Sequence, residues 1–223
     1  LLTLSRGYGM ESVRQRAMST AETVSASLSE VVDDSTLELV VDLRLAFGRL
    51  LAALGANERA EKEHLDTAEL SLSQGWTETA CAALALASHA AQARGDRASS
   101  GRAWHQCRDA MESWPMNRPG ERCGILVDAV GDPLVAVQVL SALAEVLVDG
   151  VEEDHSRAPI IREIISRASE QASRCVSPPQ GAVESLARVE ERIAPYGRGR
   201  GGRRRPGSTT TITTDGQAAA GGK

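Results

Sequence analysis

Apolar residues recur along this chain at the three- and four-residue spacing of amphipathic helices, with polar residues between them. The pattern predicts nine helices. Their expected bounds are 10–30, 35–54, 57–74, 77–94, 96–113, 119–130, 133–149, 156–175 and 178–194. Alternation with a period of two, which would indicate half-buried strands, is hard to find. The pattern therefore favours an all-α fold.

The breaks between the expected helices share a recurring glycine. Gly55, Gly95 and Gly131 each follow an apolar helical stretch and precede a new helix, as glycine commonly does at a helix C-terminus. Short connections make consecutive helices antiparallel, so the chain should form an α-solenoid of about four hairpins in a right-handed stack. The expected pairs are 35–54 with 57–74, 77–94 with 96–113, 119–130 with 133–149, and 156–175 with 178–194.

Three helix starts carry capping signals. Ser35 and Glu38 have the spacing of a capping box, in which each side chain binds a backbone N–H of the first turn. Asp132 precedes a proline at the first helical position, and Ser177 precedes two prolines with Gln180 at the capping-box position. Each pattern predicts the first turn of a helix.

Some of these helices have an apolar stripe along one face, which must pack against a neighbouring helix. One apolar stripe lies in helix 35–54 and comprises Leu39, Leu43, Phe47, Leu50, Leu51 and Leu54. Another lies in helix 156–175 and comprises Ile160, Ile161, Ile164, Ile165, Ala168 and Ala172. Helix 133–149 is apolar except for a narrow stripe of Gln138, Ser141, Glu145 and Asp149, so we expect an interior position, with an open partner or dimer surface as the alternative.

The chain divides into three expected parts. Residues 1–34 hold a lone helix, residues 35–194 form the repeat domain, and residues 195–223 form a disordered tail rich in Arg, Gly and Thr. The lone helix lacks a pairing partner, and the chain begins at Leu1 instead of Met. Both features suggest a piece of a longer protein.

Several positions resemble the tetratricopeptide repeat. That family places a small residue within the first helix, Gly at the turn and Ala five residues later. Gly48, Gly55 and Ala60 fit this spacing, and Gly131 with Ala136 fits again, whereas Gly95 is followed by Ser100, Leu51 replaces the usual Tyr, and His64 occupies a usually aromatic position. The resemblance implies a solenoid that binds peptides or protein segments on its concave face, of the kind found in large actinobacterial regulators.

Composition narrows the class of protein. The chain is 42% hydrophobic but only 3% aromatic, so its core should be aliphatic. Its four cysteines are far apart and lack paired spacing, which predicts buried free thiols, and neither a leader nor a membrane-length apolar run is evident. We therefore expect a cytoplasmic protein that does not bind membranes and needs no cofactor.

The net charge of −5 conceals a basic tail on an acidic body. Arginine-glycine runs attract nucleic-acid phosphates without sequence preference. Only Tyr196 is available there for base stacking, so nucleic-acid binding is possible but not favoured. The arginines concerned are Arg198, Arg200, Arg203, Arg204 and Arg205.

Metal and catalytic signals are weak. Glu61 with His64, and Glu152 with His155, have the Glu-x-x-His spacing of carboxylate-bridged metal bundles, but the additional glutamates are missing from the apolar stripes. A zinc site from Cys81, His89, His105 and Cys107 lacks the close ligand pairs that zinc prefers, so no metal is expected. Residues 6–10 resemble a kinase glycine box without its strands, and are better interpreted as a turn.

We therefore expect a non-enzymatic protein-interaction module whose groove is lined by the first helices of successive hairpins. The expected partner-binding residues are Arg44, Arg49, His89 and Gln92, polar positions at the edges of apolar stripes. Trp104 and Trp114 should pack between helices, whereas Trp76 could do so or anchor a peptide. The alternatives are a sensor segment of a bacterial transcriptional regulator, a metal-dependent bundle enzyme, and nucleic-acid binding through the tail; the oligomeric state stays open.

Overall fold

The computed structural model of the protein describes residues 36–196, together with residues 12, 15–16, 19–20, 22–23 and 26. These N-terminal residues are helical, as expected for a helix over 10–30. Ser35 of the expected capping box lies outside the described residues, as do residues 6–10 and the tail arginines.

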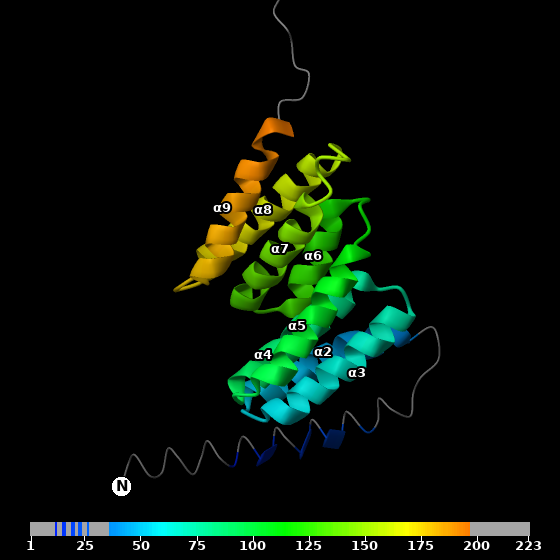
Figure 1. Ribbon diagram of the computed structural model, residues 1–223. Coiled ribbons are helices and arrows are strands. Elements are labelled where there is room, and N and C mark those ends of the chain that lie inside the picture. The colour runs from blue at the N-terminus through cyan, green and yellow to red at the C-terminus, as the bar shows by residue number, and fades with distance from the viewer. Residues whose placement is uncertain are drawn as a thin grey trace, which may run out of the picture.

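All secondary structure within residues 36–196 is helical, and no strand occurs there. The all-α fold is thus confirmed, and the helices pack as a repeat-like array (Figure 1). The helices are α2 (Leu37–Ala53), α3 (Asn57–Ser73), α4 (Thr77–Ala93), α5 (Arg97–Glu112), α6 (Pro119–Val130), α7 (Pro133–Val148), α8 (Arg157–Arg174) and α9 (Gln180–Ile193), followed by the short 3₁₀ turn η1 (Ala194–Tyr196).

Three equivalent turns join the first four of these helices. Gly55, Gly75 and Gly95 have φ angles of 77°, 75° and 83°, a conformation that favours glycine. Each glycine N–H donates to the carbonyl three residues earlier at 2.9–3.1 Å, and the next N–H donates to the carbonyl five residues earlier at 2.9–3.0 Å. This is the Schellman pattern, which satisfies carbonyls at the helix end. Helices α2 to α5 therefore follow one another with a period of 20 residues.

Two aspartates cap helix starts, as short acidic side chains do. Asp132 accepts the N–H of Leu134 at 2.8 Å at the start of α7, so that expectation is confirmed. Asp96 accepts the N–H of Ser99 at 3.0 Å at the start of α5. The expected start of α9 was wrong, because the extended Pro179 holds the N-cap position and Ser177 lies too far upstream to cap the helix.

The expected hairpin pairing holds in the first half of the array and changes in the second. α2 packs with α3 and α4 packs with α5, as expected. α7, however, packs chiefly on α8 and α9 and only marginally on α6, while α9 packs more on α7 than on α8. The reason is that α7 is apolar around most of its circumference, so several helices cover it at once. Its interior position is confirmed.

The expected apolar stripe of α2 divides between two faces. Phe47 and Leu51 are buried, whereas Leu39 is 60% exposed and Leu50 is 40% exposed. The core instead takes the side of α2 that carries Val41 and Leu45. In α8 the expected stripe does face the core, where Ile161, Ile164 and Ala168 are buried. The core is aliphatic, as the composition predicts.

None of the helices in the described part of the chain has both the length and the apolar character that crossing a membrane requires.

Candidate functional site

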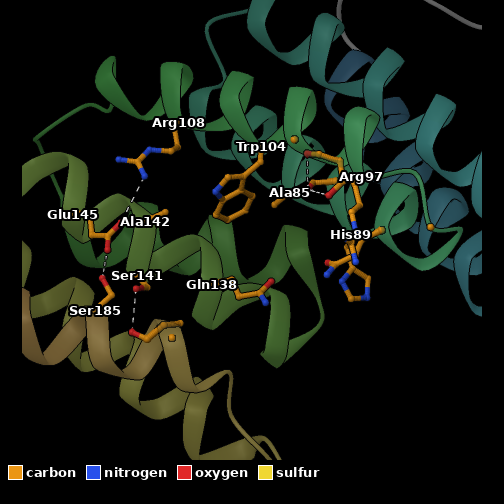
Figure 2. Close-up of a pocket in the computed structure, with 17 residues that line it drawn as sticks. Ala85, His89, Arg97, Trp104, Arg108, Gln138, Ser141, Ala142, Glu145 and Ser185 are labelled. Atoms are coloured by element: carbon orange, nitrogen blue, oxygen red, sulfur yellow. Dashed lines mark hydrogen bonds and ion pairs between the residues drawn. The ribbon is translucent and has the colours of Figure 1, made fainter.

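A groove with a volume of about 850 Å³ lies where α4 and α5 meet α7 and α9 (Figure 2). Trp104 of α5 projects into it between the two ends. His89 and Gln92 come from α4, and Gln138 comes from α7. Two of the four expected partner-binding residues thus share one groove, but three of its four helices are the second members of the expected hairpins.

The polar stripe of α7 forms one wall of this groove by binding α9. Ser141 Oγ donates to the carbonyl of Ala182 at 3.1 Å, and the Ser185 hydroxyl donates to Glu145. One turn beyond Glu145, Asp149 pairs with an arginine of α9 at 2.9 Å. The polar stripe of α7, for which an open partner surface was the alternative prediction, therefore binds α9 and closes one side of the groove.

Charges in the groove are only partly paired. Glu145 lies 3.7 Å from the guanidinium of Arg108, an ion pair between half-exposed side chains. Within the described residues, the side chains of His89, Gln92, Arg97 and Gln138 make no hydrogen bond or ion pair with the protein. The groove therefore presents hydrogen-bonding groups beside an indole ring, a combination suited to a polypeptide segment.

The two expected arginines lie elsewhere. Arg49 Nη1 donates to the carbonyls of Asp128 and Ala129 at 3.2 and 3.0 Å, so it caps the C-terminus of α6. Arg44 is half-buried on α2, outside the residues that line the groove. Partner binding by any of the four expected residues stays a prediction.

Arg49 does line another, smaller cavity of about 370 Å³ together with two histidines. We call it the small cavity; it lies between the C-terminal ends of α2 and α4 and the starts of α3 and α7, and Arg49, His64 and His89 line it. His89 thus borders both the groove and the small cavity.

His64 is only 1% exposed, and its Nδ1 atom has no hydrogen-bond partner among the described residues. Burial, with a smaller contribution from the Arg49 charge, lowers the pKa of His64 to about 4. The ring is therefore neutral at pH 7. It packs directly on Gly48, which leaves no room for a side chain there.

The expected metal-ligand pairs have other partners. Glu61 accepts two hydrogen bonds from Arg94, at 2.9 Å from Nε and 2.6 Å from Nη2. Glu152 and His155 are exposed, and the His155 ring lies 4.7 Å from the ring of Tyr196. No group of three His, Cys, Asp or Glu residues in the described part of the chain could hold a metal ion.

The expected thiols are free, and three of the four are fully buried. Cys107 donates to the carbonyl of Cys81 at 3.4 Å across the α4–α5 contact. The hydrogen bond with Cys81, followed by burial, raises the pKa of Cys107 well above its usual range. Burial also raises the pKa of Cys123 to about 12. Since His105 is exposed and His89 faces the groove, the four residues of the zinc alternative are not brought together.

The tryptophans fill gaps between helices. Trp114 is buried, and both Trp76 and Trp104 pack partly against the main core. Trp104 also lines the groove, whereas the sequence predicted only that it packs between helices. Gln138 was equally missed as a groove residue, although its place in the polar stripe of α7 was a visible signal.

Comparisons with protein-family models, with curated proteins and with solved structures gave no match to this chain.

Proposed function

We propose that this protein is a non-enzymatic interaction module that binds an extended segment of a protein partner in the groove between α4, α5, α7 and α9. The observation that carries the proposal is the groove's composition: Trp104 at its centre and, along it, hydrogen-bonding side chains that have no partner among the described residues. Its volume of about 850 Å³ accommodates a few residues of peptide.

The physical argument rests on hydrogen bonding and on stacking. An extended peptide carries backbone N–H and C=O groups that need partners when they leave water. Gln92 and Gln138 can both donate and accept, so they suit a backbone of any sequence. Trp104 offers a flat apolar surface for a side chain of the peptide, and tryptophan often dominates binding energy at such surfaces.

We also propose that the array is related to the tetratricopeptide repeats and is part of a larger regulatory protein. Gly48, at the family's small position, packs on a side chain of the next helix, and Ala60 is fully buried at the turn-proximal position. These contacts support the proposal because they are the close helix approaches for which the family's small residues are required.

A crosslinking experiment tests the groove. A photoreactive benzoyl-phenylalanine at Gln92, which is exposed, should capture a discrete partner from the native host's extract. The same residue at Arg118, exposed at the start of α6, is the matched control and should not capture that partner. A Trp104→Ala change in the Gln92-labelled protein should abolish the capture.

Equal capture from both positions, or capture that persists in the Trp104→Ala protein, would argue against the groove. Circular dichroism of the Trp104→Ala protein checks that the array is still folded, because this indole also packs partly on the core.

A further inference from the structure

The guanidinium of Arg49 lines the small cavity and forms no ion pair with a carboxylate of the described residues. Within residues 36–196, Arg49 makes its hydrogen bonds through Nη1 and only to two backbone carbonyls. It forms no ion pair within the described part of the chain, so its Nε and Nη2 hydrogens stay available. A half-buried guanidinium with available N–H groups attracts an oxyanion, which it can bind through two parallel hydrogen bonds.

His64 provides a second, independent indication of a ligand. Its imidazole lines the small cavity, is 1% exposed, and has a buried Nδ1 atom that finds no hydrogen-bond partner in the part of the chain that the structure describes. Buried polar atoms in proteins nearly always have a hydrogen-bond partner. Because the ring is neutral at pH 7, it can offer a donor or an acceptor without adding charge beside Arg49.

The remaining walls define the kind of molecule that fits. Leu86, Ala90 and Val135 supply an apolar surface, and the volume of about 370 Å³ is near the lower limit of small-ligand sites. Ala93 and Asp132 are exposed at the mouth, so the cavity is open to water. The Asp132 carboxylate faces the first N–H groups of α7 and accepts the N–H of Leu134 at 2.8 Å. The positive end of the helix dipole therefore offsets the negative charge that Asp132 presents to the cavity.

From these features we infer that the small cavity is a binding site for a small organic acid. The carboxylate of the ligand pairs with Arg49 and lies near the imidazoles of His64 and His89, and a short hydrocarbon part packs on Leu86, Ala90 and Val135. This inference goes beyond the proposed peptide groove and does not depend on it, since the two cavities share only His89 among the residues just named.

Sodium butyrate is a suitable probe, with butyramide as its uncharged counterpart. In protein with ¹⁵N-labelled histidines at pH 7 and constant ionic strength, butyrate should shift the ring signals of His64 and His89 along a saturable curve in the millimolar range. Butyramide can accept a hydrogen bond from Arg49 but carries no charge to pair with the guanidinium, so it should bind at least tenfold more weakly. A shift that does not saturate, or an equal response to butyramide, would overturn the inference.

Two variant pairs localise the site. Arg49→Gln should weaken butyrate binding at least tenfold, whereas Arg44→Gln on the same helix should leave it unchanged. Because Arg49 also caps α6, a second pair avoids that helix: Ala93→Glu at the exposed mouth should repel butyrate, and Ala93→Gln should not. Equal binding by the Glu and Gln variants at position 93 would contradict the inference even if Arg49→Gln failed to fold.

Discussion

Gly48 lies against the imidazole of His64, and replacing this glycine by alanine should destabilise the protein. A Cβ atom at position 48 would lie 2.7 Å from both ring nitrogens of His64 and closer still to Cε1, nearer than real contacts allow. The ring is almost fully buried, so relieving these contacts would require the His64 side chain to leave its packed position.

The magnitude follows from two opposing effects. Overpacking a well-packed core costs about 1–3 kcal/mol, and contacts as short as those to the His64 ring place Gly48→Ala near the upper limit. Alanine in place of glycine inside a helix gains about 1 kcal/mol. We therefore expect a net loss of about 2 kcal/mol, or a urea midpoint lower by about 1 M for an m-value of about 2 kcal/mol/M.

Urea unfolding followed by circular dichroism at 222 nm measures this difference. Gly124→Ala in α6 is the matched control, because it lies inside a helix and the added Cβ meets no described atom within 4 Å beyond the backbone of its own helix; it should gain about 1 kcal/mol from propensity alone. In a His64→Ala background, Gly48→Ala should become stabilising, which corresponds to a coupling of about 3 kcal/mol. The reasoning fails if Gly48→Ala is as stable as the wild type, or costs the same with and without the imidazole.

Three further predictions concern stability. Since the pKa of His64 falls from 6.5 to about 4 on folding, protonation favours the unfolded chain. The free energy of unfolding should therefore drop by up to about 3 kcal/mol as the pH falls from 6.5 to 4. In His64→Ala, the urea midpoint should not show this part of the decrease with falling pH. Arg122→Leu leaves the buried Glu78 without its ion-pair partner and should cost about 2–3 kcal/mol in thermal or urea unfolding, whereas Arg118→Leu, which breaks an exposed pair, should cost less than about 0.5 kcal/mol. Gly95→Ala meets no atoms within 4 Å but keeps a φ of 83°, so a loss of about 1–2 kcal/mol from backbone strain alone should appear in the same assay.

Local signals predicted the helices of this protein well. Gly55 and Gly95 marked their turns because only a residue without Cβ adopts the left-handed conformation easily. Gly75 carries the same signal and was overlooked as a repeat marker, although it lies midway between the other two and completes the period of 20 residues. The chemistry of helix ends is encoded within a few residues, so sequence reasoning can recover it.

Helix partners were predicted less well, because packing depends on residues distant in sequence. A short connection between α6 and α7 suggested a hairpin, but Pro133 starts a helix so apolar that α8 and α9 cover it as well. In α2, the exposed Leu39 and the buried Leu51 look alike in sequence. Which face a neighbour covers is settled only when the whole array is assembled.

The candidate site was recovered in part for the same reason. His89 and Gln92 do line the groove between α4, α5, α7 and α9, as polar positions at the edge of a stripe on α4. Arg49 met the same criterion, but the carbonyls that it caps belong to α6, about 80 residues later. Trp104 and Gln138 enter the groove from α5 and α7, and no local pattern relates them to each other.

The position of His89 on the common border of two cavities has a thermodynamic consequence. If an acid bound beside Arg49 fixes the orientation of this imidazole, it changes the affinity of the groove for a peptide by some factor. Linkage then requires the peptide to change the affinity for the acid by the same factor. In that case the concentration of a metabolite would control how much of the protein is bound to its partner. The coupling would pass through a single side chain on α4, without any movement of the helices around it.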